Sequence, residues 1–151
     1  MISRANIERA KSRIGSHLRS TPVLQVEAGT LCDGGPLALK LEQLQPTGSF
    51  KLRGAFNAML TKTPPKAGVV AFSGGNHGAA VAYAATKLGL RSTIFVPEFA
   101  GPVKIARMRS FGAEVIVPGN DVDAILAQYA EHAERTGALS IHPYDDLDVI
   151  C

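Results

Sequence analysis

Residues 68–78 read Gly68-Val69-Val70-Ala71-Phe72-Ser73-Gly74-Gly75-Asn76-His77-Gly78. The apolar first half is typical of a buried strand, and the small residues after it are typical of a loop. Apolar residues then recur at helical spacing as far as Leu88, where Gly89 provides a helix terminator. The stretch therefore predicts a strand that leads through a glycine-rich loop into a helix from about Asn76.

The same order of strand and helix extends in both directions from this unit. A helix is predicted from Lys51 to a point before Pro64, a second is opened by Pro102, and a third is capped by Asn120 or Asp121. Further strands are predicted at 93–96, 114–117 and 139–142. Strands that alternate with helices in this way form parallel βαβ units with helices on both faces. We therefore expect a three-layer α/β/α fold with a four-stranded parallel sheet over residues 51–144.

Residues 1–45 do not follow this alternation. Their pattern predicts a helix over residues 4–18, ended by Thr21-Pro22, and strands over 23–26 and 37–42. We interpret them as an incomplete part of a second α/β domain.

Composition excludes several classes of protein. The chain of 151 residues is 46% hydrophobic and 19% charged, which is typical of a globular domain. The net charge of +3 comes without a basic run, so we expect no nucleic-acid surface. Apolar runs are only as long as strands and the N-terminus lacks a signal-peptide core, which favours a cytoplasmic protein with no membrane contact. The histidines have no zinc-ligand spacing, so no metal site is expected.

Two loops could carry chemistry. Amide groups at the start of the helix after Ser73–Gly78 could bind an anion, although an ordinary glycine-rich turn would have the same composition. Lys51 could be a solvated charge, or it could be a reactive amine. The positive end of a helix dipole disfavours an ammonium at its N-terminus, and the neutral amine is the form that attacks carbonyl groups.

Taken together, these loops resemble a known family. Ser49–Ala55 resembles the pyridoxal-phosphate lysine motif of the serine/threonine dehydratases (threonine ammonia-lyases), and Ser73–Gly78 resembles their Ser-x-Gly-Asn-His loop. The family belongs to the fold type II pyridoxal-phosphate enzymes and includes serine racemase. Thr21-Pro22, Leu39–Glu42 and His142–Asp146 are also similar to family segments.

The resemblance covers the N-terminal half of the family. Its phosphate-binding glycine loop and its partner for the ring nitrogen lie beyond the equivalent of residue 151. The resemblance implies that residues 1–50 are an incomplete N-terminal part of the large cofactor-binding domain. It implies that 51–144 form the small domain and that 145–151 are a truncated return to the large one.

The resemblance also implies site residues for pyridoxal phosphate. Lys51 would be the catalytic residue, holding the cofactor as a Schiff base and then moving the Cα proton. Phe50 would pack against the cofactor ring, although core packing is an alternative for it. Asn76 would bind the phenolic oxygen of the ring.

The substrate carboxylate would be held in the second loop. The resemblance assigns this role to Ser73 and to the amides of Gly75, Asn76 and His77. For His77 we expect a backbone role, with its imidazole serving structure. Arg53, two positions after the lysine and with its charge facing away from it, is also expected to be structural.

The implied activity is deamination of L-threonine or L-serine by β-elimination, which gives a 2-oxo acid and ammonia. Gly74 stands where the family usually has Ser or Ala, and in serine racemase a serine there is a second acid/base, so Gly74 favours elimination. A racemase of the same fold and an inert fragment that acts as a binding or assembly module remain as alternatives. We expect the chain alone to have little activity and to self-associate through apolar surface on residues 1–45.

Overall fold

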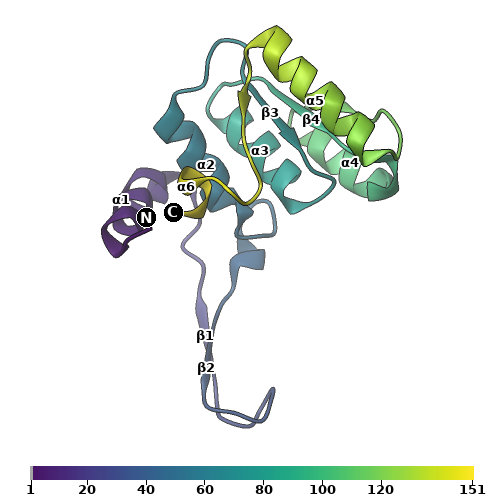
Figure 1. Cartoon of the computed structure of the whole chain (residues 1–151). Coiled ribbons are helices and arrows are strands. Elements are labelled where there is room, and N and C mark those ends of the chain that lie inside the picture. Colours follow the sequence, from purple (N-terminus) through teal and green to yellow (C-terminus); the bar gives the residue numbers. More distant parts are fainter. Residues whose placement is uncertain (1) are drawn as a thin grey trace.

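The computed structural model describes residues 2–151, and Met1, the first residue of the expected 1–50 unit, lies outside the described residues. A parallel sheet forms the centre of the body, with the strand order β5-β4-β3-β6 (Figure 1). The strands are β3 (Val69–Phe72), β4 (Ser92–Phe95), β5 (Glu114–Ile116) and β6 (Leu139–Ser140). The predicted α/β class and the four-stranded parallel sheet are confirmed.

Helices cover both faces of the sheet because alternate strand residues point to opposite sides. Val69 and Ala71 of β3 join one buried core with α2 (Lys51–Lys62), α3 (Asn76–Lys87) and α4 (Pro102–Ser110). Val70, between them, joins a second core with Ile125 of α5 (Val122–Thr136). These two cores define the three layers that were expected.

Local signals set the ends of the helices where the sequence predicted them. Pro102 occupies the first turn of α4. The side chain of Asp121 accepts hydrogen bonds from the amides of Asp123 and Ala124 at the start of α5. Gly137 ends α5 in the left-handed conformation, at φ 70°.

The N-terminal helix is shorter than predicted. α1 (Arg4–Ile14) gives way to a 3₁₀ turn, η1 (Gly15–His17), because Gly15 weakens the regular helix. Ala10 and Ile14 of α1 are buried, and the helix packs against α2. The first helix is therefore attached to the body of the protein.

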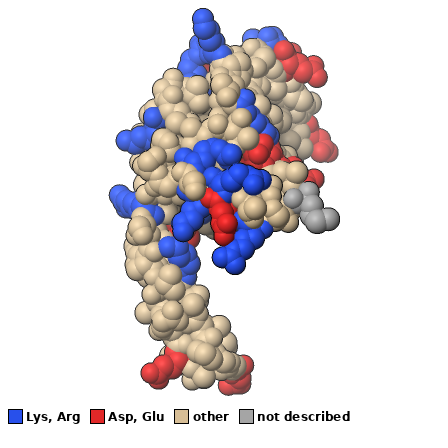
Figure 2. All heavy atoms as spheres, turned by 90° about the vertical axis from the view of Figure 1, so that its left-hand side faces the viewer, with Lys and Arg blue, Asp and Glu red and all other residues tan. Residues whose placement is uncertain are grey.

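A long hairpin projects from the body (Figure 1). It consists of β1 (Val23–Val26) and β2 (Leu37–Lys40), paired antiparallel with Val23 opposite Lys40. The prediction that β2 reaches Glu42 was wrong, because Leu41 turns the backbone and Glu42 begins the 3₁₀ turn η2 (Glu42–Leu44). The hairpin exposes a set of large apolar side chains, namely Val23, Leu24, Leu31, Leu37 and Leu39. Figure 2 shows Lys and Arg side chains gathered above the root of this arm.

Two short elements were not predicted. α6 (Leu147–Ile150) packs against α2 next to Gly54, and the 3₁₀ turn η3 (Glu98–Ala100) follows β4. Strand β6 stops at Ser140, two residues before its predicted end, because the chain then leaves the sheet toward α6. No helix within residues 2–151 is long and apolar enough to cross a membrane.

Candidate active site

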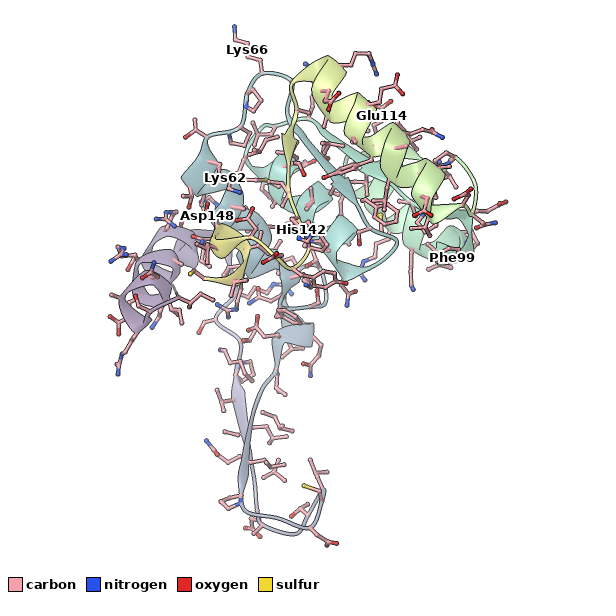
Figure 3. The ribbon with its side chains drawn as sticks, in the orientation of Figure 1. Lys62, Lys66, Phe99, Glu114, His142 and Asp148 are labelled. Carbon is pink, nitrogen blue, oxygen red and sulfur yellow. The ribbon has the colours of Figure 1, made fainter. Side chains whose placement is uncertain are left out.

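The candidate site lies at one edge of the parallel sheet. Since β3, β4 and β6 run in the same direction, the segments that follow them meet at their carboxyl ends. Figure 3 shows His142 and Phe99 at this end of the body, while Lys66, which precedes β3, lies at the opposite end. A cavity of about 860 Å³ opens here between the loop after β3, η3, α5 and the segment after β6.

Lys51 enters this cavity from the first position of α2. Its Nζ donates a hydrogen bond of 2.7 Å to the carbonyl oxygen of Pro143 and lies 4.4 Å from the centre of the Tyr144 ring. Burial lowers the pKa of the Lys51 amine below its ordinary value of 10.5. From the helix dipole, the sequence predicted that the neutral amine is favoured. In the structure, the cause of the lowered pKa is burial.

The loop from Ser73 to His77 forms the facing wall. The amide of Gly75 donates to Oγ of Ser73 at 3.2 Å, and the amide of Ser73 donates to the carbonyl of Phe95 at 3.0 Å. Asn76 is the first residue of α3, so the free amides at this helix start face the same edge of the sheet. These bonds fix the loop beside the end of β4.

His77 anchors the loop to the neighbouring strand. Its imidazole is buried, and Nε2 lies 2.9 Å from the carbonyl oxygen of Ile141. Since a carbonyl can only accept, Nε2 carries the proton and Nδ1 is the bare nitrogen. Burial lowers the pKa of His77 to about 4, and the nearby charges of Lys51 and His142 act in the same direction, against the bond to Ile141. The geometry agrees with a structural imidazole.

Arg53 holds the start of α2 against the hairpin root. Its guanidinium donates two hydrogen bonds of 2.7 Å to the carboxylate of Glu42. These bonds are the main reason that the pKa of Glu42 is lowered to about 2. The pair joins the residues on either side of the loop that carries Lys51.

The structure brings the predicted site residues together, and all of them except Phe50 line the main cavity. That group is Lys51, Ser73, Gly75, Asn76 and His77. Phe50 is different, because its ring is 60% exposed and lines an adjacent cavity of about 350 Å³. Its ring centre nevertheless lies 5.4 Å from Nζ of Lys51. Core packing, the alternative for Phe50, is therefore wrong in this structure.

Sequence reasoning missed Pro143 and Tyr144, which contact the lysine directly. The motif similarity had included them without giving them a role. Their place depends on β6 pairing with β3, and strand order cannot be read from hydrophobic periodicity. It also missed Phe99 of η3 and Lys104 of α4, which line the far wall.

The cavity has an electrostatic character that limits what it can bind. Neither it nor the adjacent cavity is lined by an Asp or Glu side chain, whereas Lys51 and Lys104 both line the main one. The N-terminus of α3 adds a partial positive charge. The arrangement suits an anionic ligand that also carries a group reactive toward an amine. Within residues 2–151, no cluster of three His, Cys, Asp or Glu side chains could hold a metal ion.

The fold is shared with pyridoxal-phosphate enzymes. The profile of the family described as "Pyridoxal-phosphate dependent enzyme" matches residues 14–151, and the chain belongs to this family.

The similar proteins include enzymes named as ammonia-lyases or deaminases and one named as a racemase. The chain is 40% identical to an L-threonine ammonia-lyase of Thermotoga maritima over 99% of its own length. It superimposes on the solved structure of a T.th. threonine deaminase with a TM-score of 0.87 at 40% identity, over 99% of this chain and 47% of that one. It matches a pyridoxal 5'-phosphate-dependent aspartate racemase with a TM-score of 0.87 at 36% identity, covering 99% and 47% of the two chains.

The match does not extend over the whole of these relatives. The chain spans 38% of the length of the Thermotoga maritima enzyme, and less than half of each solved structure named above.

Proposed function

We propose that this chain forms the lysine-bearing half of a pyridoxal-phosphate-dependent lyase that deaminates L-threonine or L-serine. One observation carries the proposal: the amine of Lys51 and the N-terminal loop of α3 share a single cavity that has no acidic lining. An amine of lowered pKa and an anion-binding helix start are what covalent amino-acid chemistry on a carbonyl cofactor needs.

The residues of the cavity fit the aldehyde end of pyridoxal phosphate. Lys51 would hold the cofactor through its amine, Asn76 would bind the oxygen of its ring, and Phe50 lies within reach of Lys51 to contact that ring. When bound, the cofactor supplies an electron sink for the charge left at Cα.

The chain's own residues would then divide the work on the substrate. The hydroxyl of Ser73 and the amides of Gly75, Asn76 and His77 would hold the substrate carboxylate at the start of α3. Lys51 would take the Cα proton as general base. Position 74 offers no side chain for a second proton transfer, which favours loss of the β-hydroxyl over racemisation.

Residues 1–50 and 145–151 would belong to a larger cofactor-binding domain, with 51–144 as the small domain. The apolar side chains exposed on the hairpin support this division, because such surface is usually covered. We accordingly expect little ammonia release from L-threonine by the 151-residue chain alone, and we expect it to self-associate through the hairpin. Release at the rate of a complete lyase would overturn the first expectation, and a monomer by light scattering would overturn the second.

Adding pyridoxal phosphate to the purified chain tests the proposal. We expect the visible absorbance band of a lysine imine, fixed by borohydride to Lys51 and located by peptide mass spectrometry. The band should disappear in Lys51→Ala and persist in Lys104→Ala, which removes the other lysine of the cavity. Labelling spread over surface lysines, with no preference for Lys51, would contradict the proposal and support the inert binding module.

Racemisation is the second candidate, and the likeness to the aspartate racemase favours it. Formation of D-serine from L-serine, without release of ammonia, would support this candidate.

A further inference from the structure

The amine of Lys51 contacts Pro143 and Tyr144, and the ring centre of Phe50 lies farther away, at 5.4 Å. The carbonyl oxygen of Pro143 accepts its hydrogen bond at 2.7 Å, and the next residue, Tyr144, places its ring centre 4.4 Å away. A carbonyl oxygen and the face of an aromatic ring are both attractive to a cation. Both contacts therefore favour the protonated form of the amine, against the burial that disfavours it.

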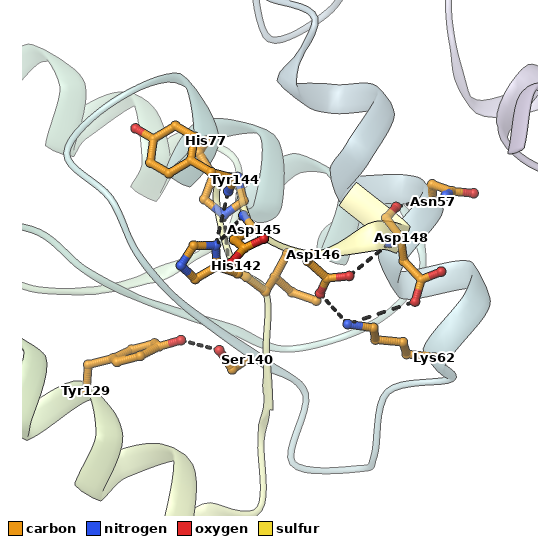
Figure 4. Close-up of polar contacts among 11 residues, drawn as sticks. Asn57, Lys62, His77, Tyr129, Ser140, His142, Tyr144, Asp145, Asp146 and Asp148 are labelled. Carbon is orange, nitrogen blue, oxygen red and sulfur yellow. Dashed lines mark hydrogen bonds and ion pairs between the residues drawn. The ribbon is translucent and has the colours of Figure 1, made fainter. Parts of the chain in front are cut away.

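This segment is held in place at both of its ends. On one side Nδ1 of His142 accepts hydrogen bonds from the amides of Tyr144, at 3.1 Å, and Asp145, at 2.8 Å. On the other side Asp146 caps α6 and forms an ion pair with Lys62 of α2. Figure 4 shows these contacts on either side of Tyr144. The position of the segment over Lys51 is thus built into the fold.

α6 adds a further attachment to α2. Asn57 lies on α2, the helix that begins with Lys51, and its side chain donates a hydrogen bond of 2.8 Å to the carbonyl of Asp148 in α6. The segment and the lysine are therefore carried by elements that are bonded to each other.

No charged side chain around Lys51 stabilises its ammonium in place of Pro143 and Tyr144. His77 on α3 is neutral above about pH 4, since burial lowers its pKa to about that value. Arg53 is paired with Glu42, and the remaining titratable side chains of the cavity are Lys104, His142, Tyr129 and Tyr144. None of the residues lining the two cavities has a carboxylate side chain that could hold the ammonium.

We infer that Pro143 and Tyr144 form a resting cradle for the protonated amine of Lys51, and that Tyr144 is a positioning residue which controls release of the amine. The cradle stands on geometry alone, whereas its importance for catalysis rests on the proposed role of Lys51. Tyr144 holds the ammonium until deprotonation weakens the attraction, and the neutral amine is then free to react.

The test compares Tyr144→Leu, which removes the aromatic face, with Tyr144→Phe, which keeps it. Each chain, without cofactor, is labelled with acetic anhydride across a range of pH, and the Lys51 peptide is quantified by mass spectrometry. Because the Tyr144 side chain is 70% exposed, its loss admits little additional water to the amine. We expect the half-reactive pH of Lys51 to fall by about half a unit in Tyr144→Leu, a roughly threefold rise in labelling below the midpoint. Tyr144→Phe should behave as the wild type.

Lys104, in the same cavity, provides the internal reference for every sample. An unchanged Lys51 midpoint in Tyr144→Leu would overturn the inference, and so would an equal shift in Tyr144→Phe. A merely structural role would lower the melting temperature without moving the midpoint.

Imine formation with pyridoxal phosphate is measured separately on the same variants. A shifted midpoint without any imine band keeps the cradle and refutes the proposed function for this chain. An imine band with an unshifted midpoint would refute the cradle and keep the proposed function.

Discussion

The α-carbon of Gly74 lies so close beneath the methyl group of Ala100 that a β-carbon added at position 74 would come within 2.7 Å of it. Carbon atoms in van der Waals contact are about 3.5–4.0 Å apart. The turn η3 therefore rests directly on the loop that opens α3. Ala100 thus occupies the space that a side chain at position 74 would need, so the proposed preference for elimination agrees with the packing.

Gly74→Ser should destabilise the protein, and Ala100→Gly should rescue it. The added side chain forces η3 away from the loop, at a cost of about 1–3 kcal/mol. In the double variant the space vacated by Ala100 admits the serine, so the free energies of unfolding should not add. Thermal or urea unfolding of the four chains measures this coupling.

Gly75→Ser is the matched control, since no atom lies within 4 Å of a β-carbon built at Gly75. Its φ of −139° is also open to other residues. Equal destabilisation at positions 74 and 75 would show that the loop, and not Ala100, resists side chains.

Gly54→Ala should detach α6 from α2. A β-carbon at position 54 would overlap the carbonyl oxygen of Val149 and lie 2.9 Å from its Cγ1. Hydrogen exchange at the amides of Val149, Ile150 and Cys151, which are bonded within α6, should accelerate markedly.

Gly15→Ala provides the comparison for this change. Gly15 has right-handed φ and ψ of −55° and −38°, and nothing lies within 4 Å of its added β-carbon. It should be neutral or stabilise the chain by up to about 1 kcal/mol. Unchanged protection of α6 in Gly54→Ala would contradict the packing described here.

These glycines mark the limit of what the sequence could predict. The strands and helices of residues 51–140 follow from apolar periodicity, proline and capping residues, all of which act locally. α6 could not be predicted, because its four residues are too few to show a helical period and depend on the close approach of Val149 to Gly54. The early ends of β2 and β6 likewise reflect tertiary contacts at Glu42 and Ile141.

The residues of the candidate site likewise fall into a group that local sequence predicted and a group that it did not. Lys51 and the Ser73–His77 loop were predicted because motif and helix start coincide in sequence. Pro143 lies 92 positions from Lys51 in the sequence, with Tyr144 next to it, and the pairing of β6 with β3 brings both to the lysine. Such a contact cannot be predicted from the spacing of residues in the sequence.

The Arg53–Glu42 pair should make stability depend on acid in a defined window. Glu42 has a folded pKa of about 2, lowered from 4.5, so its contribution is complete above pH 4.5 and is lost as the pH falls toward 2. At pH 6 a double-mutant cycle of Glu42→Gln and Arg53→Met should give a coupling of about 1–2 kcal/mol, because Arg53 is partly exposed. The coupling should vanish below pH 2.

Urea unfolding across this range measures the coupling directly. A coupling that is the same at pH 6 and at pH 2 would show that the carboxylate charge is not what holds Arg53.

His77→Asn should lower stability by an amount that depends on pH, over a higher pH range than the one given for Glu42. At pH 7 the variant loses the tie between α3 and the carbonyl of Ile141, at a cost of about 1–3 kcal/mol. The wild type has a His77 pKa of about 4, lowered from 6.5, so between these values its unfolded state binds more protons. Wild-type stability from this group is therefore complete above pH 6.5 and falls toward pH 4, and the gap between the two chains should narrow. Urea unfolding measures the gap, and Ile94→Val, a change in the buried core, is the reference whose gap stays constant. A His77→Asn gap that is constant from pH 7 to pH 4 would mean that the imidazole is not held neutral by the fold.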